Sequence, residues 1–319
     1  MLDLLRWLAS VIIETINLTK RYGDLVALNN LHLNIEEGEC FGYIGPNGAG
    51  KTTTIKILAT LLQPTWGEAR VCGHVIGYQS RKIRPLIGYV PDFFGAYSDM
   101  VVQEYLEFFA SAYGITGQHR RKIVGDVLDL TDLAYKREAL VDSLSRGMKQ
   151  RLSIARVLLH DPKVLLLDEP ASGLDPRARI EIRELLKELH KMGKTIVISS
   201  HILHELAELC STVGIIERGE LLFHGSVRDA TRQAGMGTRV QVGVADRSDL
   251  AARVLQQLEP VKSVEQNNGC LSVELKTEMH DFSFLARALL ENRLAITELR
   301  EEEANLETAF LRLTKGIVQ

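Results

Sequence analysis

The fold of this chain is decided by the stretch Gly45-Pro46-Asn47-Gly48-Ala49-Gly50-Lys51-Thr52. It follows the apolar run Cys40–Ile44 and precedes the helical pattern of Thr53–Leu62. A strand, a loop of the form G-x-x-x-x-G-K-[ST] and a helix, in this order, form a P-loop. Its glycines let the backbone fold around phosphates, and the helix N-terminus adds a positive end. The alternative is a glycine-rich turn with a solvated lysine, but chance would place the four fixed residues in such a chain only about once in a hundred cases.

Several positions of the loop have a chemical role in this interpretation. Lys51 would reach the β and γ phosphates, Thr52 would ligate Mg²⁺, and Thr53 would contact phosphate oxygens. The backbone expected to surround the phosphates belongs to Gly45, Asn47, Gly48 and Gly50. The sequence therefore predicts a site for a triphosphate and Mg²⁺.

Two adjacent acids end a second apolar run. Val164–Leu167 is unbroken, as expected of a strand buried on both faces of a parallel sheet, and Asp168 and Glu169 follow it. Mg²⁺ beside Asp168 would compensate for the burial of its charge, and Glu169 could polarise an attacking water. Taken alone, the pair could be a strand-end turn. Downstream of a P-loop, it favours catalysis.

Composition limits the class of protein. The 319 residues suggest two domains at about 150 residues each. Hydrophobic residues make up 45% and charged residues 25%, and the net charge of -3 gives no global positive field for nucleic acid. Four separated cysteines disfavour a disulfide framework and fit a reduced, cytosolic setting. No apolar run approaches the ~20 residues of a membrane span, so any membrane role needs a partner.

Residues 13–235 alternate apolar strand-like runs with helical patterns, which predicts an α/β domain. Thr195–Ser199 is another β-branched run, typical of a buried strand. Arg177–Met192 is amphipathic, with an expected apolar face of Ile180, Leu185, Leu189 and Met192. The glycines of Gln233–Thr238 predict a linker after this domain.

Residues 238–319 predict a smaller accessory domain. Alternating valines from Val240 to Val244 predict a strand, Ser248 is the expected cap of the next helix, and Asn268-Gly269 predicts a hairpin. Further patterns complete the order β-α-β-β-α-β-α, which suits a small α+β ferredoxin-like domain. The opening residues 1–12 form an N-terminal extension, either a short interfacial helix or an unstructured segment, and receive no function.

The segment Leu144-Ser145-Arg146-Gly147-Met148 introduces a family resemblance. With the P-loop and the two acids, residues 13–235 resemble the ATP-binding subunit of an ABC transporter, and this segment stands where the family has its LSGGQ signature. Ser145 is then the expected cap of the helix that follows. The resemblance implies that its hydroxyl, the Gly147 amide and the helix dipole form an anion site for the γ-phosphate held by an opposite subunit. Arg146 replaces a glycine and Met148 a glutamine, so the usual glutamine contact is not carried over.

Three further positions match the family. Tyr22 resembles the aromatic that stacks on adenine, with an ordinary edge-strand tyrosine as the alternative. Asp175 ends the segment Ala171–Asp175, which resembles the loop through which dimer partners of the family sense each other. Asp175 could also be only the cap of the helix that begins at Pro176, or serve both roles. His201 resembles the switch histidine that contacts the γ-phosphate, although a lone strand-end histidine is usually structural. Together with Lys51 and Glu169, His201 completes the expected catalytic set.

Asp92 is the departure with the largest consequence. The family normally has a glutamine there, which approaches Mg²⁺ and links the core to a helical subdomain, expected here at about residues 92–160. Aspartate keeps one oxygen ligand for the metal but shortens the reach and adds charge. The aromatics between Phe93 and Tyr113 suit the core of that subdomain, and some of them a groove for a permease helix.

The resemblance implies a P-loop ATPase that binds ATP and Mg²⁺, pairs with a second copy of itself around two ATP molecules, and drives a separate membrane permease. Such a subunit would be cytoplasmic and peripheral at the inner face of the membrane, with no nucleic acid partner expected. The ending Asn305–Thr314 resembles the C-terminal extension of multidrug and antibiotic exporter ATPases, which favours export. The alternative is a soluble ABC-type ATPase that acts on ribosomes, DNA or cofactor assembly. The transported substrate cannot be read from this chain, because the permease forms the pathway.

Overall fold

The computed structural model describes residues 11–93, 95, 99–234, 238–267, 270–276, 281–301 and 306–314. Contacts divide the chain into two compact units, and the division falls between His224 and Gly225. Within the described residues, no helix combines the length and the apolar character that a membrane crossing requires.

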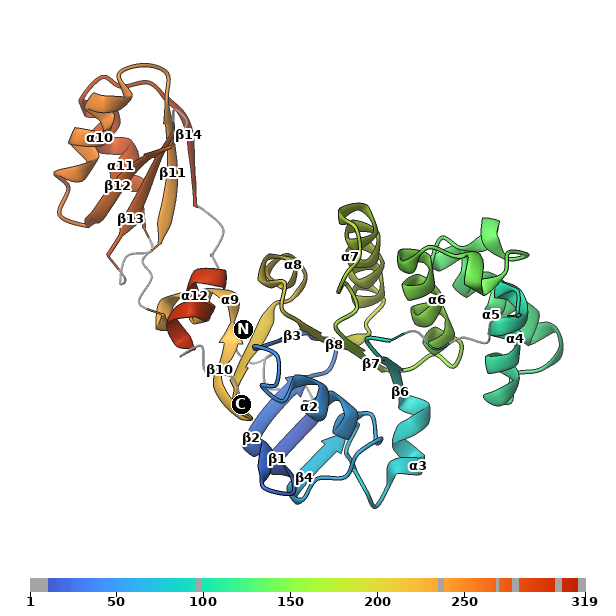
Figure 1. Cartoon of the computed structure of the whole chain (residues 1–319). Helices are drawn as coiled ribbons and strands as arrows, with labels where there is room; N and C mark the ends of the chain where they lie inside the picture. The colour runs from blue at the N-terminus through green and yellow to red at the C-terminus, as the bar shows by residue number, and fades with distance from the viewer. Residues whose placement is uncertain are drawn as a thin grey trace, which may run out of the picture. The chain divides into compact units, whose positions relative to one another are not determined.

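A six-stranded sheet forms the centre of the larger unit (Figure 1). Its strand order is β10-β9-β3-β8-β7-β6, and the pairs β3–β8, β3–β9, β6–β7 and β7–β8 are parallel. The strands are β3 (Cys40–Ile44), β6 (Ile87–Val90), β7 (Val164–Asp168), β8 (Thr195–Ser200), β9 (Thr212–Glu217) and β10 (Glu220–Ser226). Every residue of β3, β7 and β8 is buried, which explains their unbroken apolar runs and confirms the three strands predicted there.

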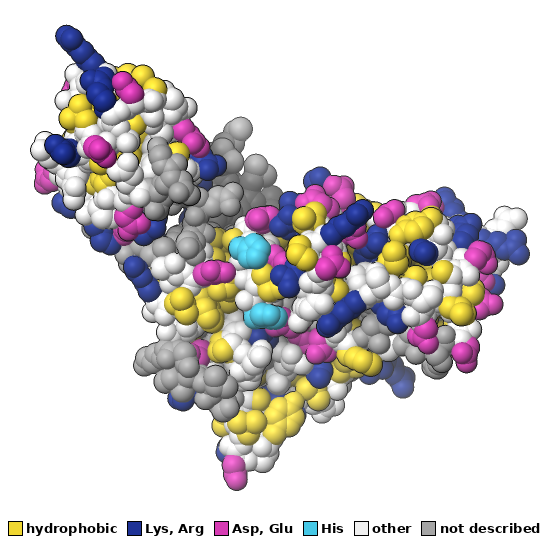
Figure 2. Space-filling view, turned by 45° about the horizontal axis from the view of Figure 1, so that its top comes forward, with side chains coloured by type: hydrophobic (Ala, Val, Ile, Leu, Met, Phe, Trp, Pro, Cys, Tyr) yellow, Lys and Arg dark blue, Asp and Glu magenta, His cyan; other side chains and the backbone are white. Residues whose placement is uncertain are grey.

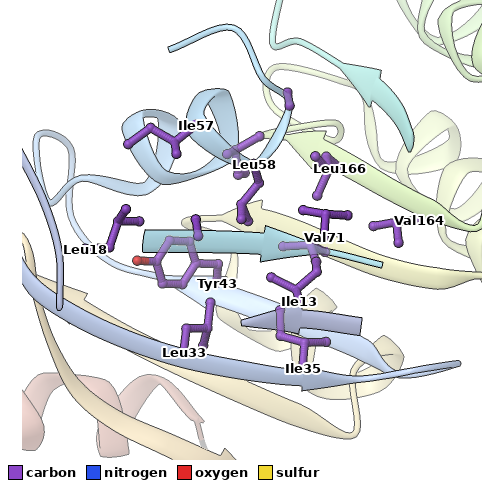
Figure 3. Close-up of a cluster of buried hydrophobic side chains, with 14 of the residues drawn as sticks. Ile13, Leu18, Leu33, Ile35, Tyr43, Ile57, Leu58, Val71, Val164 and Leu166 are labelled. Atoms are coloured by element: carbon purple, nitrogen blue, oxygen red, sulfur yellow. The ribbon is translucent and has the colours of Figure 1, made fainter. Parts of the chain in front are cut away.

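A second sheet is antiparallel and covers the helix that follows the P-loop. It consists of β1 (Val11–Tyr22), β2 (Leu25–Glu36), β4 (Trp66–Val71) and β5 (His74–Val75), in the order β2-β1-β4-β5. Helix α2 (Lys51–Leu58) contacts both β7 of the central sheet and β2 and β4 of this one. Tyr43 lies in the core between the helix and β2, close to Ile57, Leu58, Leu33 and Ile35 (Figure 3).

The remaining helices of this unit fall into two groups. Helices α7 (Pro176–Lys191) and α8 (Leu203–Leu209) lie on one side of the central sheet and α2 on the other (Figure 1). Helices α4 (Val102–Ala112), α5 (Gly117–Leu130) and α6 (Arg146–Leu158) pack on one another, in the stretch where the helical subdomain was predicted. Short elements complete the unit: α3 (Ser80–Ile83), η2 (Arg84–Leu86), η3 (Ala134–Lys136) and η4 (Val141–Ser143).

The predicted apolar face of α7 was partly wrong. Ile180 is 51% exposed and Met192 is 61% exposed. Successive residues turn by about 100° on a helix, so Ile180 points away from the face that contains Ile182. Met192 lies beyond the helix as its C-cap. The buried face consists of Ala178, Ile182, Leu185, Leu186 and Leu189.

The smaller unit has the predicted element order, on which the ferredoxin-like prediction rests. An antiparallel sheet of order β12-β13-β11-β14 packs with two helices around a core that includes Val240, Leu255 and Leu289. The elements are α9 (Val227–Gln233), β11 (Arg239–Val244), α10 (Ser248–Gln256), β12 (Val261–Asn267), β13 (Cys270–Leu275), α11 (Ser283–Glu291), β14 (Ile296–Glu301) and α12 (Leu306–Leu313).

Three details of this unit differ from the sequence patterns or extend them. The N-cap of α10 is Arg247 rather than Ser248, whose hydroxyl instead accepts a hydrogen bond from Gln266 Nε2 at 3.1 Å. Helix α9 packs on α12 and therefore belongs to the smaller unit. The boundary between the two units accordingly lies before α9, whereas the linker was predicted after it, at Gln233–Thr238. The hairpin residues Asn268 and Gly269 lie outside the described residues, but the strands on either side of them pair antiparallel.

Surface charge of the two signs is mixed. Figure 2 shows Lys and Arg interspersed with Asp and Glu over the visible face. This distribution agrees with the nearly balanced composition of 38 basic and 41 acidic residues. All four cysteines are free, and the buried thiols of Cys40 and Cys210 lie 3.6 Å apart.

Candidate nucleotide-binding and catalytic site

The P-loop is pressed against neighbouring strands at two glycines. A Cβ on Gly45 would collide with the carbonyl oxygen of Ile216, and one on Gly50 would lie 2.7 Å from that of Ala27. Gly50 also has a φ of 111°, in the left-handed region that favours glycine. The buried Lys51 ammonium donates hydrogen bonds to the carbonyls of Gly45 at 2.6 Å and Pro46 at 3.2 Å. Lys51 therefore holds the loop in its curved shape.

A pocket of about 470 Å³ lies over this loop. It brings together residues from distant parts of the sequence, and most of the predicted site residues line it. The residues that line the pocket are Tyr22, Leu25, Ala27, Pro46, Asn47, Gly48, Ala49, Gly50, Lys51, Thr52, Thr53, Asp92, Arg146, Glu169, Ser172 and His201. Among the predicted residues, Gly45, Ser145, Gly147, Asp168 and Asp175 do not line it.

Asp168 lies directly behind Thr52. Its Oδ1 accepts hydrogen bonds from Thr52 Oγ1 at 3.1 Å and from Ser199 Oγ at 2.8 Å. Its Oδ2 is buried and has no hydrogen-bond partner within the described residues. Burial raises the pKa of Asp168 above its usual range, the bonds from Ser199 and Thr52 oppose the rise, and the charges of Asp92 and Glu169 add to it.

A buried carboxylate oxygen without a partner fits a cation. The described residues contain no group of three or more His, Cys, Asp or Glu side chains that could hold a metal. Mg²⁺ in proteins commonly takes only one or two protein ligands, with phosphate oxygens and water completing the octahedron. Thr52 and Asp168 suit this pattern, and Asp92 is exposed and lines the same pocket.

Glu169 is held by four contacts. Its backbone has a φ of 52°, and its amide donates to Ser199 Oγ at 3.0 Å and to the Ser199 carbonyl at 3.2 Å. Its Oε2 lies 2.6 Å from His201 Nδ1, and its Oε1 lies 3.5 Å from Lys51 Nζ. The carboxylate therefore sits between a cation and an imidazole, an arrangement suited to a general base whose orientation is fixed.

Ser199 was missed as a member of this site. It bonds both acids because it stands opposite Asp168 in the register of the parallel pair β7 and β8. A serine at the end of a β-branched run was the signal in the sequence. The register of two strands about thirty residues apart could not be read from that run alone.

Ser145, Gly147 and Asp175 gather at the starts of two packed helices. Ser145 is the predicted N-cap of α6, and its hydroxyl accepts from the Met148 amide at 3.3 Å. Asp175 is the N-cap of α7 and accepts from the Ala178 amide at 3.0 Å. A Cβ on Gly147 would lie 2.6 Å from the Cβ of Ala178, so the helices require a glycine there.

Tyr22 and Asp92 both line the pocket. The Tyr22 side chain is 46% exposed, and the Lys20 ammonium lies 5.1 Å from its ring centroid. An exposed aromatic ring suits stacking on a base. Burial and, to a smaller extent, the negative charges of Asp168 and Asp92 raise the pKa of Tyr89 to about 12.

The position of Asp92 leads to a prediction about metal dependence. Its charge should repel a γ-phosphate when Mg²⁺ is absent, so Asp92→Gln should strengthen metal-free ATP binding about fivefold, the effect of roughly 1 kcal/mol from one exposed charge. Asp92→Ala should also hydrolyse ATP more slowly, because an oxygen near the metal is lost. ATP affinity with and without Mg²⁺, and turnover, should be measured for each protein. Asp129→Asn, which removes an exposed carboxylate of α5, is the control. Equal metal dependence and rate in all variants would contradict the prediction.

Comparison with known proteins gives consistent matches. The family model for ABC transporters matches residues 28–172. The linearmycin resistance ATP-binding protein of Bacillus subtilis is 33% identical over 301 residues, covering 93% of this chain and 96% of that protein. The Nod factor export ATP-binding protein I of Burkholderia pseudomallei (strain 1710b) is 37% identical over 296 residues, covering 92% and 94%.

Solved structures agree with these relatives. One is an ATP-binding subunit of an ABC transporter, with a TM-score of 0.64 and 29% identity, covering 70% of this chain and 93% of that one. Another is a dimeric ATP-binding cassette in a post-hydrolysis state with ADP and Pi bound, with a TM-score of 0.61 and 30% identity, covering 67% and 98%.

Proposed function

The chain belongs to the ABC transporter family, whose ATP-binding subunits hydrolyse ATP, and from this membership we propose that it pairs with a second copy to power a separate membrane permease that exports its substrate. The observation that carries the proposal is the convergence of Lys51, Glu169 and His201 on one pocket, next to the pair of Thr52 and Asp168. The permease would hold the protein at the inner face of the membrane.

The direction of transport rests on the relatives. One carries the name of an export protein and another that of a resistance protein, and both align along more than nine tenths of this chain. This alignment includes the smaller unit as well as the nucleotide pocket. The similarity that supports export therefore extends over both units and is not limited to the P-loop.

The chemistry can be derived from the residues around the pocket. Lys51 would offset the charge of the β and γ phosphates, while Thr53 and the amides of the loop bind phosphate oxygens. Thr52 and Asp168 would hold Mg²⁺, which when bound supplies positive charge to the phosphate oxygens. Glu169 would accept a proton from the attacking water, and His201 would orient the Glu169 carboxylate through their 2.6 Å contact. Tyr22 would stack on the adenine.

Pairing would complete the site with groups from the second copy. Ser145 is exposed at the N-terminus of the 13-residue helix α6 and lines no part of the pocket of its own chain. A hydroxyl and a helix N-terminus that face outward suit a phosphate held by another molecule. Pairing itself is supported by a similar ATP-binding cassette of known structure, which is dimeric with ADP and Pi bound.

Ser145 offers a test that leaves its helix intact. Aspartate and asparagine both replace serine well as N-caps, but only aspartate repels a phosphate. With a non-hydrolysable ATP analogue, the wild type and Ser145→Asn should sediment as dimers, and Ser145→Asp should remain monomeric. All three should still bind the analogue through their own P-loops. A dimer of Ser145→Asp equal to that of the wild type would contradict the proposed pairing.

A further inference from the structure

Ser199 is buried next to the two acids of the site but lies outside the nucleotide pocket. The residue is 0% exposed, and it stands opposite Asp168 in the register of β7 and β8. It does not line the pocket, so its hydroxyl would not touch ATP. Any influence of this hydroxyl on the chemistry must therefore pass through the groups that it binds.

The two hydrogen bonds of the Ser199 hydroxyl have fixed directions. The Glu169 amide can only donate, and its nitrogen lies 3.0 Å from Ser199 Oγ. The hydroxyl accepts this bond and donates its own proton to Oδ1 of the ionised Asp168, at 2.8 Å. One hydroxyl thus joins the backbone of one acid to the side chain of the other.

The bond to Asp168 decides which carboxylate oxygen is free. Oδ1 accepts from Ser199 and, at 3.1 Å, from Thr52 Oγ1. Oδ2 is buried and has no hydrogen-bond partner among the described residues. Hydrogen bonds of this kind orient a carboxylate that ligates a metal. Without the Ser199 hydroxyl, only the longer bond from Thr52 would hold the Asp168 side chain.

The bond to Glu169 holds an unfavourable backbone conformation. Glu169 has a φ of 52°, in the left-handed region that a residue with a Cβ adopts only when its surroundings hold it there. Its amide donates to both Oγ and the carbonyl oxygen of Ser199, at 3.0 and 3.2 Å. In this conformation the carboxylate lies 3.5 Å from Lys51 Nζ and 2.6 Å from Nδ1 of His201, which follows β8. A rotation of the Glu169 backbone would move the carboxylate away from both groups.

We propose that Ser199 is a positioning residue for ATP hydrolysis, whose hydroxyl fixes the orientation of Asp168 and Glu169 relative to each other. The inference rests on the roles that the proposed function gives to these two acids, but not on export or a permease. The hydroxyl acts on the attacking water through Glu169 and on Mg²⁺ binding through Asp168. Binding of the phosphates themselves is left to Lys51 and the P-loop.

The test measures turnover and binding separately on the full chain. Calorimetry gives the affinity for a non-hydrolysable ATP analogue with and without Mg²⁺. Ser199→Ala should lower turnover about 10- to 100-fold and reduce the gain in affinity from Mg²⁺ about tenfold, the usual effect of losing a hydrogen bond that orients a metal-binding carboxylate. The metal-free affinity should stay within about twofold of the wild type, because Lys51 and the P-loop are unchanged.

Two variants of equal shape isolate the hydroxyl. Ser199→Thr keeps it and should retain most of the turnover and of the gain from Mg²⁺. Ser199→Val has the shape of threonine without the hydroxyl and should behave as Ser199→Ala.

Thr195→Val is the matched control for a buried hydroxyl on the same strand. Thr195 is 0% exposed at the start of β8, and its Oγ1 accepts a hydrogen bond from the Gly38 amide at 2.8 Å. This variant should unfold at a lower temperature but leave turnover and both affinities unchanged. A loss of stability alone is therefore distinguished from a loss of positioning.

Three results would overturn the proposal. Wild-type turnover and an unchanged gain from Mg²⁺ in Ser199→Ala would remove Ser199 from the site. Equal weakening of the analogue with and without Mg²⁺ would mean that Ser199 only supports the pocket as a whole. Ser199→Thr as impaired as Ser199→Val would attribute the loss to packing. Failure of the proposed function is separately visible, as a wild type that does not bind or hydrolyse ATP in the same assays.

Discussion

Glu169→Gln should bind ATP as tightly as the wild type and turn it over about 10²- to 10⁴-fold more slowly, the usual contribution of a positioned general base. The amide has the shape of the carboxylate, and its oxygen can still accept the hydrogen bond from His201 Nδ1. It cannot take a proton from water at neutral pH. Because bound ATP is not consumed, the variant should also accumulate as an ATP-bound dimer.

Steady-state turnover, equilibrium ATP binding and sedimentation with ATP measure these three effects. Glu184→Gln, on the exposed surface of α7, is the control for loss of one carboxylate and should behave as the wild type. Wild-type turnover in Glu169→Gln would show that Glu169 is not the base.

Lys51→Ala should lose ATP affinity by about 10- to 100-fold, since one charged hydrogen-bonding partner contributes roughly 1.5–3 kcal/mol. Two effects act together. The phosphates lose a buried cation, and the carbonyls of Gly45 and Pro46 lose the ammonium that holds the loop. Hydrolysis should fall at least as much.

Calorimetry with a non-hydrolysable ATP analogue tests this prediction. Lys56 lies on the same helix as Lys51 but does not line the pocket. Lys56→Ala therefore removes a cation away from the site and should bind the ATP analogue as tightly as the wild type. ATP affinity in Lys51→Ala equal to that of Lys56→Ala would contradict the role of Lys51.

Local patterns in the sequence predicted the elements that depend on neighbouring residues. The P-loop, the buried strands β3, β7 and β8, and the caps Ser145 and Asp175 are all specified within a few residues of themselves. Their physical causes are also local: a run of apolar side chains fits a strand buried on both faces, and a short polar side chain satisfies a free helix amide.

Features that depend on distant contacts could not be predicted in the same way. Ser199 joins the two acids only because of strand register, and the Arg146 guanidinium lies against Gly173, a residue distant in the sequence. The face of α7 was misjudged because apolar residues such as Ile180 were counted without knowing which side the sheet covers. The cap of α10 differs from the prediction because Arg247 adopts a left-handed backbone conformation there.

The central claim is that two copies build each ATP site together, and mixing two inactive proteins tests it most directly. Lys51→Ala lacks the P-loop cation, and Ser145→Asp keeps its helix cap but repels a partner's phosphate. In a mixed dimer, one site combines the intact Lys51 of one copy with the intact Ser145 of the other. The account predicts that an equal mixture recovers up to about a quarter of wild-type turnover, because the two-fold symmetric pairing leaves one intact site in each mixed dimer. Turnover of the mixture equal to the sum of the two separate variants would contradict it.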